Sequence, residues 1–287
     1  MKVAAVQIDI SLRQVETNLA QIERRLTEAA SDGAELVVFP ECAVTGYCFN
    51  HLNEALAYTD TIPGATTDRL VDACADANTF AVVGMLERDG YASYNACVLV
   101  GPQGLIGKYR KIHLPHLGVD NHVAPGDARW QVYDAGGARV GMHICYDSAF
   151  PESARSMALD GAEVLALPTN FPPGAECLCE HVLPARAMEN GVYLIAANRV
   201  GTERGFTFLG GSKICGPDGE IIATASPDEE EIIYADIDLE RARDKRRVRV
   251  PGKHEINRFA DRRPEMYTRI TAATERQLRL NFDDYDG

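Results

Sequence analysis

Short apolar runs follow one another along this chain and alternate with a few amphipathic helical patterns, and this alternation restricts the folds open to it. Segments of strand length fall at residues 2–8, 35–39, 80–86, 94–100, 130–134, 138–145, 163–167, 192–198, 208–215, 220–225 and 231–237. Helical periodicity occupies residues 14–31, 66–78, 151–160 and 179–190. Many strands with interspersed helices predict a layered α/β fold in which two sheets pack face to face.

Polar turns agree with this arrangement. Residues 216–219 (Gly-Pro-Asp-Gly) separate two strand-like runs and predict a hairpin, and residues 101–104 (Gly-Pro-Gln-Gly) form a similar turn. No Ser/Gly/Pro-rich linker and no repeat divides the 287 residues, so they make up one large domain or two modest ones. Beyond about residue 240 we expect a charged helix and then a tail, with residues 281–287 mobile.

The bulk composition narrows the class of partner. Hydrophobic residues make up 46% and charged residues 25% of the chain, as in ordinary globular proteins. A net charge of −13 argues against a nucleic-acid partner, because neutralising phosphates takes clustered Lys and Arg. The basic run at residues 241–249 is the local exception, and we interpret it as a solvated helix with carboxylate partners on a neighbouring surface.

The sequence also suggests a compartment. The N-terminus lacks the pattern of a signal peptide, and no apolar stretch approaches the length of a membrane span, so we expect no membrane partner. The eight cysteines lie inside strand- and helix-like segments and do not punctuate a small loop-rich chain, which is typical of free thiols in a reducing compartment. We therefore predict a cytoplasmic protein.

Reactive side chains occur just beyond several of the apolar runs. Cys145 ends one run and stands before a helical pattern that starts with Pro151, where a helix dipole would stabilise a thiolate. Glu41 and Lys111 follow similar runs, and side chains at strand ends can converge along one edge of a sheet. Taken singly, the cysteine is more typical of a small core residue, and the Glu and Lys of surface or ion-paired residues.

Three motifs in a fixed order make the catalytic interpretation stronger. Phe39-Pro40-Glu41 comes first, the run Tyr-Arg-Lys-Ile-His-Leu at residues 109–114 second, and Ile-Cys-Tyr-Asp at residues 144–147 third. In this order the chain resembles the nitrilase superfamily of carbon–nitrogen hydrolases over nearly its whole length. The resemblance implies that Glu41 is the general base, Lys111 the electrophilic stabiliser and Cys145 the nucleophile.

The resemblance also implies a reaction. We expect hydrolysis of a linear, non-peptide C–N bond, in an aliphatic amide or an N-carbamoyl amine, to acid and ammonia through a thioester on Cys145. Lys111 and the backbone N–H of Tyr146 would stabilise the oxyanion, with no metal or organic cofactor. A nitrilase that attacks a nitrile carbon would use the same three residues, and a binding or scaffold protein on the same fold is the alternative from another class.

For the architecture, the resemblance implies a four-layer α-β-β-α sandwich that pairs with a second subunit, as a homodimer or a higher homo-oligomer. We expect the carbon–nitrogen hydrolase domain to span residues 1–265. Residues 266–287 would then form a C-terminal extension, either an interface segment or a mobile tail.

The chain departs from the family pattern at two places. A second glutamate usually follows the lysine motif, but residues 116–127 contain none, and Asp120 is the nearest candidate. A shorter side chain must approach Lys111 more closely; the alternative is a turn aspartate beside Asn121. Many relatives also carry an arginine soon after the cysteine, where this chain has Ser148-Ala149, which removes an anchor for an acidic substrate group.

The segments after each motif supply the expected walls of a substrate pocket. Besides Tyr146, these candidates for substrate binding are Tyr47, Phe49, His116, Asn170 and Phe171. Residues 176–181 (Glu-Cys-Leu-Cys-Glu-His) have ligand-type side chains, but C-x-C is not a usual zinc spacing and no second pair follows, so we expect no metal. We interpret His113, His116 and His122 as residues at the edge of the pocket or in solvent.

Overall fold

The structure is a computed structural model that describes residues 1–272. The chain divides into two units, Met1–Lys245 and Arg246–Gly287, of which the second is described to residue 272. The predicted tail at residues 281–287 lies outside the described residues. Among those described, no helix combines the length and apolar character that a membrane crossing requires.

The first unit contains two six-stranded sheets. The first has the order β14-β1-β2-β3-β4-β5, formed by Glu231–Asp236, Lys2–Gln7, Leu36–Val38, Phe80–Asp89, Ala92–Gly101 and Gly104–Arg110. β1, β2 and β3 run parallel, and the remaining neighbours in this sheet are antiparallel.

The second sheet has a similar construction. Its order is β13-β12-β9-β8-β7-β6, formed by Ile221–Thr224, Lys213–Cys215, Tyr193–Ala197, Val164–Pro168, Ala138–Met142 and Val132–Ala135. β7, β8 and β9 are parallel and its other pairs are antiparallel. The two sheets face each other through β1, β2 and β3 on one side and β8 and β9 on the other.

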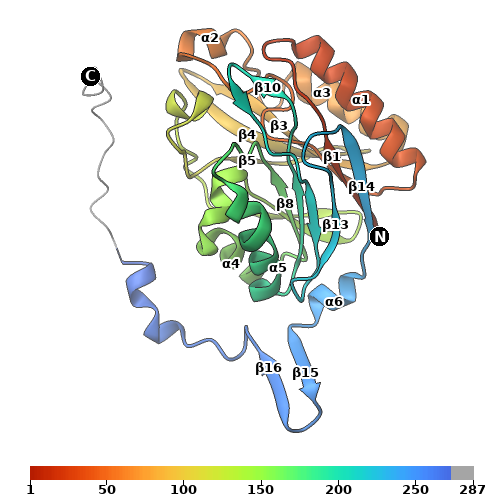
Figure 1. The fold of residues 1–287 in the computed structure, drawn as a ribbon, viewed down its shortest axis with the longest axis vertical. Coiled ribbons are helices and arrows are strands. Elements are labelled where there is room, and N and C mark those ends of the chain that lie inside the picture. Colours follow the sequence, from red (N-terminus) through yellow and green to blue (C-terminus); the bar gives the residue numbers. More distant parts are fainter. Residues whose placement is uncertain (273–287) are drawn as a thin grey trace. The chain divides into compact units, whose positions relative to one another are not determined.

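Helices form the outer layers. α1 (Val15–Ser31) and α3 (Ala65–Ala77) contact each other and cover the first sheet, while α4 (Pro151–Leu159) and α5 (Leu183–Asn190) do the same for the second (Figure 1). In α1, Leu19, Ile22 and Leu26 are buried against the first sheet because the helical period of 3.6 residues places them on one face. The predicted α-β-β-α order of layers is confirmed.

The predicted turns are also present. Residues 216–219 connect β12 to β13 as an antiparallel hairpin, and residues 101–104 connect β4 to β5. β5 itself was not predicted, because two glycines and two basic residues dilute its apolar pattern. The shorter elements of this unit are α2 (Leu52–Leu56), α6 (Leu239–Arg243) and the small hairpin of β10 (Thr202–Glu203) and β11 (Phe206–Thr207).

Three predicted elements need correction. The strand expected at residues 208–215 is reduced to β12, because Gly210 and Gly211 both have positive φ and interrupt an extended chain. The helix expected at 179–190 begins with a π-helical turn, Leu178–Val182, before α5. The single charged helix at 241–249 is wrong, since α6 ends at Arg243.

The carboxylate partners predicted for the basic run do exist. Arg241 pairs with Glu220, and Arg243 pairs with Glu163 and Glu240. In the second unit, β15 (Arg246–Val250) pairs antiparallel with β16 (His254–Asn257). The β-branched Val248 and Val250, followed by Pro-Gly at a turn, favour this hairpin over a helix. Two short 3₁₀ turns, Pro264–Met266 and Thr268–Ile270, follow.

Candidate active site

The three residues singled out from the motifs all stand just beyond strands. Glu41 follows β2, Lys111 comes directly after β5, and Cys145 opens a 3₁₀ helix (Cys145–Ala149) soon after β7. The side chains of Glu41 and Lys111 are completely buried, and Cys145 is nearly so. Two of these strands belong to the first sheet and one to the second, so the site is formed where the sheets face each other.

Lys111 lies between two carboxylates. Its Nζ donates to Oε1 of Glu41 at 2.7 Å and to Oδ2 of Asp120 at 2.5 Å. Asp120 belongs to a 3₁₀ helix, Gly118–Asn121, and is buried. The structure therefore brings together Lys111, Glu41 and Asp120, the candidate replacement for the family's second glutamate.

Two further side chains, Tyr47 and Asn95, hold the carboxylates. The hydroxyl of Tyr47 donates to Oδ2 of Asp120 at 2.8 Å. Asn95, which was not predicted, donates through Nδ2 to Glu41 at 2.7 Å and to Asp120 at 2.8 Å. The available signal was an amide that directly precedes the apolar run of strand β4.

The charges in this cluster influence one another strongly. Burial raises the pKa of Glu41, and the charge of Asp120 raises it further, although Lys111 and Asn95 oppose the shift. Burial lowers the pKa of Lys111, but the charges of Asp120 and Glu41 outweigh burial and hold the pKa well above its ordinary value. Lys111 is therefore a permanent cation at neutral pH.

The cysteine is held in a strained local conformation. Cys145 has a φ of +47°, in the left-handed region that non-glycine residues rarely adopt. Asp147 fixes this turn, because its Oδ2 accepts from the backbone N–H of Ile144 at 3.0 Å and from the hydroxyl of Tyr109 at 2.7 Å. Such strain is typical of functional positions that the surrounding structure over-determines.

One sequence-based expectation about the thiol is wrong. Burial raises the pKa of Cys145, the charge of Glu41 raises it further, and Lys111 offsets only part of the shift. The α-helix begins at Pro151, several residues beyond the sulfur, so its dipole does not stabilise a resting thiolate. Cys145 is a neutral thiol at rest and needs a base to become a nucleophile.

The expected pocket residues fall into different surroundings. Asn170 donates to the backbone carbonyl of Glu41 at 2.8 Å, whereas Phe171 is buried and Phe49 packs against Tyr58 in a hydrophobic cluster. His116 is exposed. The ring of Tyr146 is partly exposed and meets Phe150 edge to face at 5.1 Å.

A guanidinium does bind at Ser148 and Ala149, where the family's arginine is missing, but it comes from a distant part of the chain. Arg186 of α5 donates to the backbone carbonyls of Ser148 at 2.9 Å and Ala149 at 3.1 Å. Its charge is also paired with Glu189 at 3.0 Å. This arginine supports the turn after Cys145 by binding its backbone, which the local sequence could not indicate.

The side chain of His113 has other partners in the structure. Its Nδ1 lies 2.7 Å from Oδ1 of Asp147, and its ring stacks on Phe150 with centroids 3.6 Å apart. Within residues 1–272, no group of three or more His, Cys, Asp and Glu side chains is arranged to hold a metal ion.

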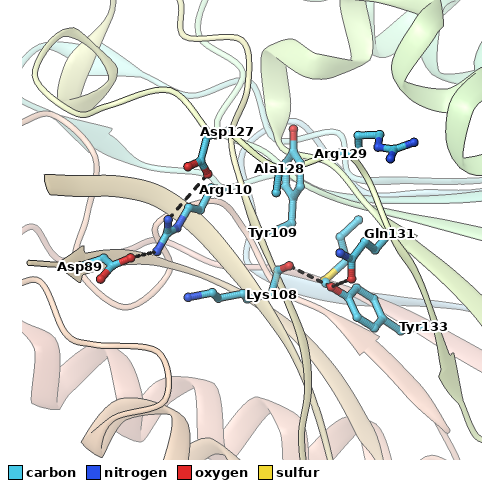
Figure 2. A pocket seen from close by; sticks show the side chains of 10 residues that line it. Asp89, Lys108, Tyr109, Arg110, Asp127, Ala128, Arg129, Gln131 and Tyr133 are labelled. Carbon is cyan, nitrogen blue, oxygen red and sulfur yellow. Dashed lines mark hydrogen bonds and ion pairs between the residues drawn. The ribbon is translucent and has the colours of Figure 1, made fainter.

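A hollow of about 280 Å³ lies beside β5, separate from this cluster (Figure 2). Asp89, Arg110 and Asp127 form its charged side, where Arg110 pairs with Asp89 at 2.7 Å. Its lining includes none of Glu41, Lys111 and Cys145. The candidate active site is therefore the buried cluster and not this hollow.

A buried cysteine beside a carboxylate–lysine–carboxylate cluster, within an α-β-β-α sandwich, defines a class of thiol-dependent hydrolases. The family model described as carbon-nitrogen hydrolase matches residues 2–247. The chain therefore belongs to the carbon-nitrogen hydrolase family, and it is an amidase-type enzyme that hydrolyses carbon–nitrogen bonds.

Individual relatives and structures agree with this assignment. A nitrilase of Pyrococcus abyssi is 43% identical over 94% of this chain and 100% of its own length. An N-carbamoylputrescine amidase of Solanum lycopersicum is 33% identical over 92% of this chain and 93% of its own. The structure of an amidase from Nesterenkonia sp. superimposes with a TM-score of 0.78 at 24% identity, covering 94% of this chain and 96% of the other, and shows the same fold.

Proposed function

We propose that this enzyme hydrolyses a small aliphatic amide or N-carbamoyl amine to acid and ammonia, with Cys145 as nucleophile, Glu41 as general base and Lys111 as electrophilic stabiliser. One observation supports these roles best. Glu41 has Oε1 held by Lys111 and Asn95, whereas its buried Oε2 has no hydrogen-bond partner among the described residues. A fixed carboxylate with one free oxygen is suited to taking a proton.

The reaction begins when sulfur attacks the substrate carbonyl. Oε2 of Glu41 takes the thiol proton as Cys145 forms its bond to carbon, and the carbonyl oxygen becomes an oxyanion. Lys111 and the backbone N–H of Tyr146 stabilise that oxygen. Glu41 returns the proton to the nitrogen, the C–N bond breaks, and ammonia leaves a thioester on Cys145.

Hydrolysis of the thioester repeats the proton transfer. Glu41 takes a proton from water as the water oxygen attacks the thioester carbon, and the C–S bond breaks. The acid is released, and the proton on Glu41 returns to the sulfur. Each transfer uses groups of this chain and water, so we propose that no metal or organic cofactor takes part.

The electrostatics of the site suit this sequence of steps. Burial raises the pKa of both the Glu41 carboxyl and the Cys145 thiol. The thiol is therefore harder to deprotonate, but the Glu41 carboxylate is also a stronger base for taking its proton. In this proposal Asp120 replaces the family's second glutamate, since it keeps Lys111 charged and in place. Tyr47, Phe49, His116, Asn170 and Phe171 remain the proposed substrate contacts.

A nitrile substrate is the alternative within the same chemistry. The relative that is 43% identical is named a nitrilase, whereas those at 31–33% identity include a citrullinase, an N-carbamoylputrescine amidase and an omega-amidase. We favour the amide or N-carbamoyl substrate because amidase names recur among both the relatives and the structural neighbours.

The same proposal includes the location, the assembly and the domain bounds of the protein. All eight cysteines lie in the described residues and are free thiols, which supports a cytoplasmic location. We also propose a homodimer or a higher homo-oligomer, in which a second subunit continues the layering. The hydrolase domain is proposed to extend to residue 265, followed by the extension 266–287; the family match ends at residue 247 and the first compact unit at Lys245.

The test is an ammonia-release screen over small aliphatic amides, ω-amides, N-carbamoyl amines and nitriles. The Cys145→Ala variant should abolish turnover and keep the fold, and Cys177→Ala is the matched control because Cys177 is an exposed free thiol. Mass spectrometry of substrate-treated enzyme should find an acyl adduct on Cys145. Activity above about a thousandth of wild type in Cys145→Ala would exclude that nucleophile. No turnover and no adduct with any substrate would favour the binding or scaffold alternative.

A further inference from the structure

Asn95 occupies an unusual position in β4. It is completely buried in a strand whose other central residues are apolar. A buried amide is costly unless all its polar atoms are paired. Here each donor and acceptor of its side chain is used, and the partners of its NH₂ group are two carboxylates.

The contacts of Asn95 reach all three charged residues of the cluster. Nδ2 donates to Oε1 of Glu41 at 2.7 Å and to Oδ1 of Asp120 at 2.8 Å. Its backbone carbonyl accepts from the backbone N–H of Lys111 at 2.8 Å. Because ionised carboxylates only accept hydrogen bonds, the NH₂ side of the amide must face them.

The amide oxygen points the other way. Oδ1 of Asn95 accepts from Sγ of Cys42 at 3.6 Å, so the amide is held at both ends. The side chain cannot turn over without placing its oxygen against two anions. Asn95 is therefore fixed as a donor to both carboxylates.

The cluster has an imbalance of charge that this donor reduces. Glu41 and Asp120 are two anions around the single cation Lys111, all buried. In a site of low dielectric, two neighbouring carboxylates tend to share a proton, and a protonated Glu41 could not act as a base. A neutral donor shared by both opposes that protonation without adding a second cation.

We propose that Asn95 is a positioning residue of the proposed hydrolysis. It keeps Glu41 and Asp120 ionised together around Lys111, and it holds Oε1 of Glu41 so that the free Oε2 can act as the base. This inference rests on the proposed function. The hydrogen bond from Asn95 is one of the influences that lower the pKa of Glu41 against burial and the charge of Asp120. The other titratable groups that interact with the charge of Glu41 are Lys111, Tyr47 and the thiols of Cys42, Cys97 and Cys145.

The decisive measurement is the pH profile of kcat/KM for Asn95→Leu, which keeps the approximate shape and removes the donors. We expect its acid limb to move up by about one pH unit, so that activity on that limb falls by up to about tenfold and recovers at higher pH. KM should change little. A merely structural role would instead lower activity equally at all pH values, and that parallel loss would overturn the inference.

Ser93→Ala is the matched control. Ser93 lies two residues earlier in β4, is buried, and has a hydroxyl with no hydrogen-bond partner in the described part of the chain. Its pH profile should remain that of wild type. If Asn95→Leu does not fold, as judged by circular dichroism, Asn95→Ser replaces it, since one hydroxyl can serve only one carboxylate at a time and should give a smaller shift in the same direction.

A second readout does not depend on turnover. Infrared difference spectra against pH should show a protonated-carboxyl band in Asn95→Leu at a higher pH than in wild type, and this band should disappear when Glu41→Gln is added. A band unchanged by Asn95→Leu would overturn the inference. Ammonia release by Cys145→Ala at the wild-type rate would instead refute the proposed function. A failure of the inference about Asn95 and a failure of the proposed function are therefore distinguishable.

Discussion

The Oδ2 atom of Asp120 lies 2.5 Å from Nζ of Lys111. A short side chain reaches the lysine because its 3₁₀ helix packs directly on Tyr47: the backbone N–H of Val119 donates to the Tyr47 carbonyl at 2.8 Å. Gly118 permits this approach, since it has a φ of +49° and a Cβ there would lie 2.5 Å from the Tyr47 ring. The loop thus moves the carboxylate toward Lys111.

Replacing Asp120 by Asn should lower turnover about tenfold to a thousandfold, because Lys111 loses one anion and stabilises the oxyanion less well. Asp120→Glu should retain more activity than Asn, since the charge is preserved. The measurements are kcat/KM and the melting temperature, which should change little in Asp120→Asn. Equal turnover in Asp120→Asn and wild type would reduce Asp120 to a turn residue.

Lys111→Ala and Lys111→Arg should both be inactive, with a loss of about 3 kcal/mol or more in transition-state stabilisation. The site holds Nζ between two carboxylate oxygens at 2.5 and 2.7 Å in a fully buried space, and a planar guanidinium is too broad for it. Steady-state kinetics with each variant decide the point. An active Arg variant would mean that only a general positive field is needed.

Asp147 connects the lysine segment to the cysteine turn, since it accepts from Tyr109 and from the backbone N–H groups of Ile144 and His113. Asp147→Asn keeps the size but turns one acceptor into a donor facing other donors. We expect kcat to fall about tenfold or more and Cys145 to react more slowly with iodoacetamide. Asp134→Asn, at an exposed position of the edge strand β6, is the control. Unchanged alkylation would show that Asp147 does not position the thiol.

His143 should make stability depend on pH. Burial lowers its pKa from 6.5 to about 4, so the unfolded chain binds the proton more strongly between these values. Stability is therefore full above pH 6.5 and falls as the pH drops toward 4, by about 2 kcal/mol between pH 7 and pH 5. Urea unfolding at both pH values should show this difference in wild type and a smaller one in His143→Asn. The same slope in both proteins would assign it to other groups.

Several elements were predictable because their patterns are local. Leu19, Ile22 and Leu26 mark α1 by spacing alone, and the runs of β1, β8 and β9 are apolar because both faces of these strands are buried. β5 escaped prediction, since it is an edge strand whose side chains are mostly only half-buried and mixed in character. The basic run after α6 was misassigned because arginine is compatible with helix and strand alike.

The sequence by itself determined the order of motifs, the turn residues and the chemical identities of Glu41, Lys111 and Cys145, because each depends on neighbours along the chain. Tertiary structure decided which residues complete the site. From the sequence Asp120 was a candidate by position alone and Asn95 stood out only as an amide in a mostly apolar strand, while Arg186 on α5 has no local signal for its role. Their roles depend on contacts between distant segments, and so does the protonation state of Cys145, since burial arises only when the two sheets pack together.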